Sequence, residues 1–121
     1  MKMQITPEDH LKGSVIDPGW YPCIVKDEEE KVAKTDGSAY SEVKLEITDG
    51  PFKGVVLYTN FSEKAPGFAI EFLKACGYNL DPKKPVDVDL HACINKALMV
   101  SVKRGEWNGR PKNEVNGYRA K

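Results

Sequence analysis

The chain has 121 residues, 40% of them apolar and 30% charged, with a formal net charge of zero, which is the composition of one ordinary globular domain. No apolar run reaches the roughly 18 residues of a membrane helix, and the first residues lack the apolar stretch of a secretory signal. Three cysteines (Cys23, Cys76, Cys93) cannot build a complete disulfide framework, which agrees with a reducing compartment. Together these features lead us to expect a cytoplasmic protein without membrane contact.

The first strong strand signal comes after an irregular start. Residues 1–17 follow neither a helical nor a strand period and are interrupted by Pro7 and Gly13, so we expect a flexible N-terminal arm followed by a folded domain over 18–121. The β-branched and aromatic run 20–25 predicts a strand. It continues into the acidic run 27–30. Four adjacent acids cannot share a buried face, so the strand should be bent, exposed at an edge or interrupted there.

The clearest alternation in the sequence predicts a half-buried second strand, with Val43, Leu45 and Ile47 on one face. The run 55–61 returns as its partner. A two-residue turn at 49–50 would force Pro51, which has no N–H to donate, into the ladder, so a longer loop is favoured. The resulting register pairs Ile47 with Val55, Leu45 with Leu57, Lys44 with Tyr58 and Glu42 with Asn60.

One amphipathic helix is expected next. Pro66 suits the first turn of a helix and Gly77 suits the position just past its end. Phe68, Phe72 and Cys76 recur at helical spacing and should form the buried stripe. The segment 86–94 favours a short helical turn.

Two further strands complete the order. Residues 97–103 alternate again, residues 105–111 are expected to form a turn-rich loop with Asn108-Gly109 at its tip, and residues 112–118 are expected to form the last strand. An all-β chain with one helix, in the order β-β-β-α-β-β, is typical of the five-stranded OB-fold barrel. A split βαβ sandwich with a different strand count is the alternative.

The sequence offers little for catalysis or metal binding. His91 and Cys93, with Cys76 upstream, lack a CxxC pair or a second nearby histidine, so we expect no metal. No nucleophile, phosphate-loop or zinc-protease motif occurs, and Asp87 and Asp89 have no apparent lysine partner. We therefore expect neither an enzyme nor a cofactor.

Aromatic residues interleaved with cations favour nucleic-acid binding instead. Residues 1–95 carry 11 lysines against 16 acidic residues, a net charge of −5, whereas residues 96–121 carry +5. Aromatic rings can stack on any base and lysine or arginine can neutralise phosphates. Against this, Glu42 and Glu46 share the outer strand face and would repel phosphate. Trp20 is interpreted as a structural residue at a strand start. The candidate DNA-binding residues are Tyr40, Lys44, Tyr58, Asn60, Lys103, Arg104, Trp107, Arg110 and Lys112.

Four runs resemble a family of phage-encoded proteins once catalogued as a domain of unknown function. They are Gly19-Trp20-Tyr21, Asp36-Gly37, the loop Asp49-Gly50-Pro51-Phe52-Lys53-Gly54, and the stretch from Trp107 to Tyr118. The resemblance covers roughly residues 18–119 and implies single-stranded-DNA binding during phage replication and recombination. Many such binders end in an acidic tail that recruits partners, whereas this chain ends in a basic segment.

We therefore expect a single-stranded-DNA-binding protein with little sequence preference, which protects DNA in phage replication or recombination in the host cytoplasm. Its partners would be single-stranded DNA and phage recombination or replication proteins, and it could form a homo-oligomer. The alternative is an adaptor of the same machinery that holds a protein partner and does not touch DNA.

Overall fold

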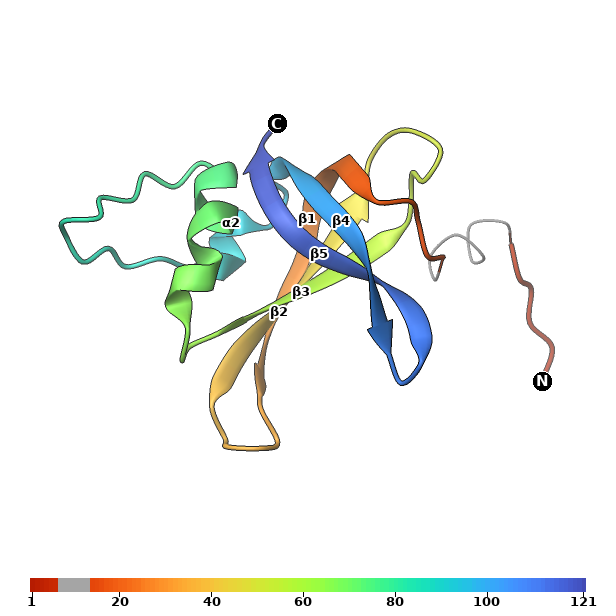
Figure 1. Cartoon of the computed structure of the whole chain (residues 1–121), viewed down its shortest axis with the longest axis horizontal. Helices are drawn as coiled ribbons and strands as arrows, with labels where there is room; N and C mark the ends of the chain where they lie inside the picture. The colour runs from red at the N-terminus through yellow and green to blue at the C-terminus, as the bar shows by residue number, and fades with distance from the viewer. Residues whose placement is uncertain (7–13) are drawn as a thin grey trace.

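The computed structural model describes residues 1–6 and 14–121 and consists mostly of β-strands (Figure 1). The elements are β1 (Gly19–Val32), β2 (Ala39–Ile47), β3 (Val56–Ser62), the 3₁₀ turn η1 (Pro66–Ala69), helix α2 (Ile70–Ala75), the 3₁₀ turn η2 (Leu90–Cys93), β4 (Ala97–Trp107) and β5 (Arg110–Ala120). The strands form one antiparallel five-stranded sheet in the order β3-β2-β1-β4-β5. The expected all-β chain with one short helix is confirmed.

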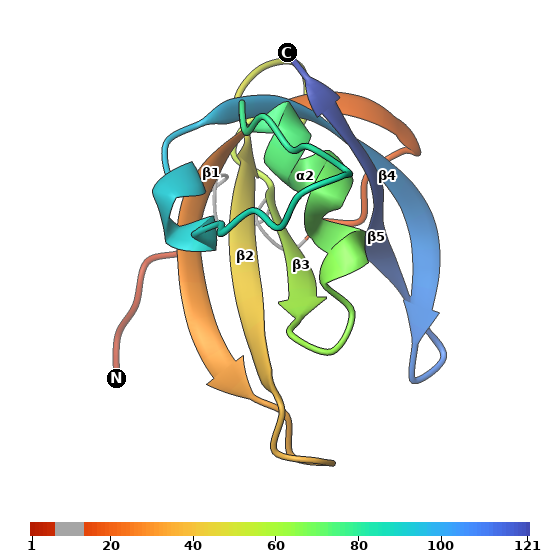
Figure 2. The ribbon, with the colours of Figure 1, turned by 90° about the vertical axis from the view of Figure 1, so that its left-hand side faces the viewer.

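The sheet is strongly curved, so that its two end strands approach each other. The Thr59 hydroxyl on β3 lies 2.5 Å from the Tyr118 hydroxyl on β5, and the rings of Phe61 and Tyr118 are 5.9 Å apart. Helix α2 lies across the open side of the curve, between β2 and β5 (Figure 2). Phe72 of this helix is fully buried and its ring lies 5.0 Å from Phe61 and 5.4 Å from Tyr118. One aromatic cluster therefore joins the helix to both end strands.

Alternate residues of the strands build the core. Its strand residues are Cys23, Val25, Val43, Leu45, Ile47, Leu57, Phe61, Leu98, Val100 and Val102. The expected register of β2 and β3 is confirmed, since Lys44 pairs with Tyr58 and Leu45 with Leu57. A one-residue slip would turn one apolar set toward water. The expected bend in β1 is a shift of register between Val25 and Asp27, where the acidic run begins.

The expected turn tip at Asn108-Gly109 is confirmed, but the expected extent of the loop, 105–111, is wrong. The two strands stay paired out to Trp107 and Arg110, so only two residues make the turn. Asn108 and Gly109 both have positive φ, 51° and 76°, which are the angles of a two-residue hairpin turn whose twist matches that of the strands. The consequence is a long β4–β5 hairpin that projects beyond the sheet.

The expected helix forms over 66–75, but one of its predicted core residues is exposed. Phe68 is 79% exposed, whereas the neighbouring Ala69 is buried. The reason is that the first turn is a 3₁₀ turn with three residues per turn, which shifts the phase of the buried stripe. Gly77, with φ of 102°, ends the helix as expected. The turn η2 lies inside the segment 86–94 where a short helical turn was expected.

The packed domain begins before residue 18. Ile16 is buried in the core, its N–H donates to Asn113 Oδ1 at 2.9 Å, and the Asn113 amide donates to the carbonyl of Ser14 at 2.7 Å. Residues 14–17 therefore belong to the domain, while residues 7–13 of the expected arm lie outside the described residues. None of the helices found in residues 1–6 and 14–121 has the length and apolar character that a membrane crossing requires.

Candidate nucleic-acid interface

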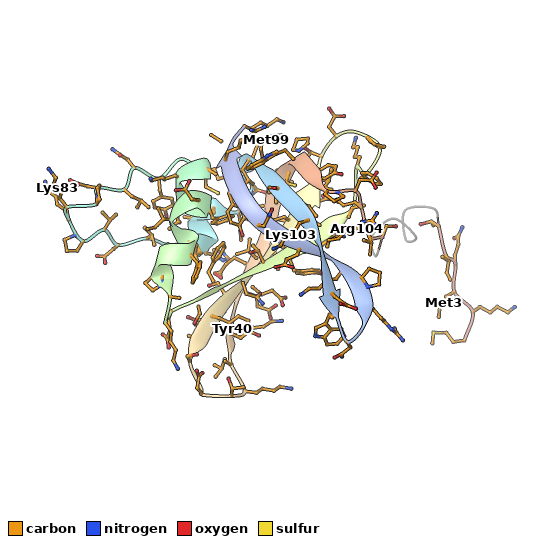
Figure 3. The ribbon with its side chains drawn as sticks, in the orientation of Figure 1. Met3, Tyr40, Lys83, Met99, Lys103 and Arg104 are labelled. Carbon is orange, nitrogen blue, oxygen red and sulfur yellow. The ribbon has the colours of Figure 1, made fainter. Side chains whose placement is uncertain are left out.

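Two hairpins, β1–β2 and β4–β5, extend toward the same side of the molecule (Figures 1 and 2). The nine candidate residues all lie on strands β2, β3, β4 and β5. Tyr40 lies on the β1–β2 hairpin, apart from Lys103 and Arg104 (Figure 3). Eight of the nine form two groups: the β2–β3 group (Tyr40, Lys44, Tyr58, Asn60) and the hairpin group (Lys103, Trp107, Arg110, Lys112).

The β2–β3 group occupies the outer face of two paired strands. Lys44 and Tyr58 are direct cross-strand partners, and the Tyr58 side chain is 56% exposed. Asn60 is exposed one pair of positions further along β3, whereas Tyr40 is half-buried. Because residues i and i+2 of a strand share a face, Tyr58 and Asn60 point the same way, with Lys44 beside them.

The acidic residues of this face are largely paired. Lys31 lies 3.1 Å from Glu42, and this hydrogen bond raises the pKa of the lysine. Lys26 lies 3.1 Å from Glu46. Lys44 makes no ion pair with any residue that the structure describes. Its β1 partner is Asp27, however, so the charges of this face nearly cancel and its most prominent exposed group is the Tyr58 ring.

The hairpin group is more basic. Trp107 pairs with Arg110, Lys112 lies opposite Gly105, and Lys103 lies opposite Glu114 at 3.8 Å. These positions alternate along both strands and therefore share one face of the hairpin. Trp107 is 66% exposed, and neither Arg110 nor Lys112 forms an ion pair within residues 1–6 and 14–121. The face thus presents an indole ring beside two unpaired cations.

Arg104 does not belong with this group. It follows Lys103 directly and so points to the opposite face of β4, where its guanidinium lies 3.4 Å from Asp17. The sequence showed a Lys-Arg pair leading into the hairpin but gave no sign that residues 14–17 cover one of its faces. Arg104 therefore contacts the N-terminal segment and does not share the face of Trp107.

A groove between β3 and β5 is lined by Trp20 and Phe68, for which the sequence had predicted structural roles and no part in binding. It measures about 420 Å³ and is lined by Trp20, Thr59, Asn60, Phe61, Phe68, Glu71, Val115, Asn116, Gly117 and Tyr118. Trp20 is 42% exposed, because it lies on the outer face of β1, opposite Ser101. The signal was present in the sequence: Cys23 and Val25 face the core, so strand alternation puts Trp20 on the other side.

The groove connects the two groups of candidate residues. Asn60 belongs to the β2–β3 group and also lines the groove. On the other wall, Trp20 pairs with Ser101, which lies two residues before Lys103 on the same face of β4. The guanidinium carbon of Arg119 lies 4.3 Å from the centre of the Trp20 ring, within cation–π range. Aromatic, amide and cationic side chains therefore follow one another around the outside of the sheet.

The cysteine thiols lie in the core and take no part in the surface described above. All three thiols are buried, and burial raises the pKa values of Cys23 and Cys76 to about 12 and also raises that of Cys93. In the part of the chain that the structure describes, no three His, Cys, Asp or Glu side chains come together in a way that could hold a metal ion. The groups that this side of the molecule presents to solvent are rings, amides and positive charges.

Comparison with known proteins gives a family but no activity. The family model described as "Protein of unknown function (DUF669)" matches residues 4–121, almost the whole chain, and the protein therefore belongs to this family. A search of curated proteins found no match.

Proposed function

We propose that this DUF669 protein binds single-stranded DNA with little sequence preference, and that its curved sheet is an OB-fold barrel. The strand order β3-β2-β1-β4-β5 supports the barrel, because closing β3 onto β5 would give the five-stranded Greek-key order. The approach of Thr59 to Tyr118 supports it as well. The helix between β3 and β4, packed at the open side, is where an OB-fold carries its helix.

The observation that carries the proposal is the exposed Trp107 at the end of the β4–β5 hairpin, beside Arg110 and Lys112, which form no ion pair with the residues that the structure describes. In OB-folds, the face of the second and third strands and the flanking hairpin loops bind oligonucleotides. Trp107 and Tyr58 would stack on bases, which contributes roughly 1–3 kcal/mol per base irrespective of base identity. Arg110, Lys112 and Lys44 would neutralise phosphates.

Site size, self-association and a cellular role can be added to this proposal. One domain would cover on the order of 4–16 nucleotides, and self-association would raise avidity by linking sites. The resemblance to phage-encoded proteins suggests protection of single-stranded DNA in replication or recombination, in the host cytoplasm, together with proteins of that machinery. None of these activities requires catalysis by the chain itself.

The test is a titration of the protein with oligo-dT while tryptophan fluorescence is followed. We expect quenching that saturates, that 0.5 M salt reverses because phosphate contacts release counterions (roughly 0.7 per contact), and that a DNA duplex of equal length does not reproduce. Absence of quenching together with absence of a mobility shift would overturn the proposal. Capture of a recombination enzyme under those conditions would instead indicate a protein adaptor.

A further inference from the structure

We infer that the groove between β3 and β5 binds a nucleobase of the single strand, as a stacking site separate from Tyr58 and Trp107. The inference rests on the proposed function and assigns a further part of the surface to it. Its location is supported by continuity, because Asn60 belongs both to the β2–β3 group and to the groove. A strand that leaves the Tyr58 face over Asn60 would enter the groove directly.

Two exposed rings provide the stacking surface. Trp20 enters from β1 and Phe68 from the 3₁₀ turn η1, so the rings come from segments far apart in the chain. Phe68 is 79% exposed and Trp20 is 42% exposed. Single exposed apolar residues are common, but two large aromatic residues lining one groove form a patch of the kind that marks a binding site.

The polar lining suits a base better than a phosphate. Asn60 and Asn116 carry amides that can both donate and accept hydrogen bonds, and neither side chain hydrogen-bonds to another described residue. Glu71 on the helix side places a negative charge in the wall, which disfavours phosphate there. Arg119, stacked over Trp20, provides a cation for the backbone of a nucleotide whose base lies in the groove.

The size and the lining of the groove favour a nucleobase over a second kind of occupant, a peptide strand that pairs with the edge of β3 or β5. The volume of about 420 Å³ lies within the range of roughly 300–1,000 Å³ typical of small-ligand sites. Ring stacking and amide contacts to a base edge use the side chains that line the groove, whereas strand addition would use main-chain groups and leave the two rings without a role.

The two tryptophans allow the groove and the hairpin to be observed separately, since the chain has no others. In Trp107→Phe, fluorescence reports only on Trp20; in Trp20→Phe, it reports only on Trp107. At a saturating concentration of oligo-dT, we expect the emission of both single-tryptophan proteins to change. A change in Trp107 alone would overturn the groove site and leave the proposed function standing, and loss of all binding by the wild type would overturn both.

A second measurement removes a ring that does not support the fold. Phe68→Ala should weaken oligo-dT binding roughly 5- to 150-fold, the range expected for one lost stacking contact. The melting temperature should not change, because Phe68 is exposed. Ile70→Ala is the matched control, since Ile70 lies in the same helical segment but borders a different depression. Wild-type affinity in Phe68→Ala, or an equal loss in Ile70→Ala, would contradict the inference.

Discussion

The Trp20 ring on β1 reaches across β4 to lie against Gly117 on β5. A Cβ atom at Gly117 would lie 3.4 Å from Cη2 of Trp20 and 3.3 Å from Cβ of Ser101. The ring can occupy this place because the residue below it has no side chain and the residue between, Ser101, is small. The absence of a side chain at Gly117 therefore leaves room for the ring and helps to set its position in the β3–β5 groove.

Gly117→Ala should displace the Trp20 ring. The added methyl group would lie closer than an ordinary van der Waals contact to Ser101 and would touch the Trp20 ring. We expect destabilisation of about 1 kcal/mol, the low end for overpacking, because the ring is partly exposed and can shift. Urea unfolding and the emission of Trp20 in a Trp107→Phe background would measure both effects. Asn116→Ala, at an exposed neighbouring position, should leave stability unchanged; equal stability of all three proteins would contradict this packing argument.

Trp107→Ala should weaken single-stranded-DNA binding while the melting temperature stays within about a degree of the wild type. The side chain is 66% exposed at the end of a hairpin, so its removal leaves no cavity. The expected loss in affinity is roughly 1–3 kcal/mol for one stacked base. Binding by fluorescence anisotropy and melting by circular dichroism are the measurements. A fall of many degrees would show that Trp107 supports the fold.

Lys112→Ala should lower the salt dependence of DNA binding. Loss of one phosphate contact should reduce the slope of log K against log salt by about 0.7. Arg104→Ala is a stringent control, because it removes the same charge from the same hairpin but from the opposite face, where Arg104 contacts Asp17. Titrations at four salt concentrations would compare the slopes. An equal reduction in both variants would mean that the two faces are not distinguished by DNA.

The turn between β1 and β2 should be sensitive to acid through Asp36. Hydrogen bonds from Lys64, and then from Ser38, lower the pKa of this carboxyl to about 2. Because the pKa is lowered in the folded state, its contribution to stability is present above about pH 4 and is lost as the pH falls toward 2. Carboxyl titration by NMR would give the pKa directly, and Lys64→Ala should raise it. A titration near 4 in the wild type would contradict the contact.

The three thiols should be inert in the folded protein. Burial raises the pKa values of Cys23 and Cys76 to about 12, so almost no thiolate exists near neutral pH. Reaction with a chromogenic disulfide reagent at pH 8 should release less than one equivalent in native buffer and three in concentrated urea. Rapid release of one equivalent without denaturant would show that a cysteine is accessible.

Much of the sheet could be predicted from local pattern. The alternation of Val43 and Leu45, together with Pro51 in the loop, was enough to place Lys44 opposite Tyr58, because a period of two leaves one register that keeps both apolar sets inside. Local pattern also predicted the irregularity in β1, from its acidic run, and the helical segment that stops just before Gly77. The length of the β4–β5 hairpin was missed because polar residues around Trp107 look like a loop in sequence.

Periodicity by itself determined which residues share a face with their neighbours along the chain, and from it came the strands, the helix and most of the candidate residues. Only the tertiary structure decided which faces are open to solvent: residues 14–17 cover the Arg104 side of the hairpin, and a 3₁₀ turn points Phe68 outward. It also brought Thr59 to Tyr118, 59 positions away, and so made the groove. The physical reason is that such contacts depend on how the whole sheet curves to bury its core, which no local pattern encodes.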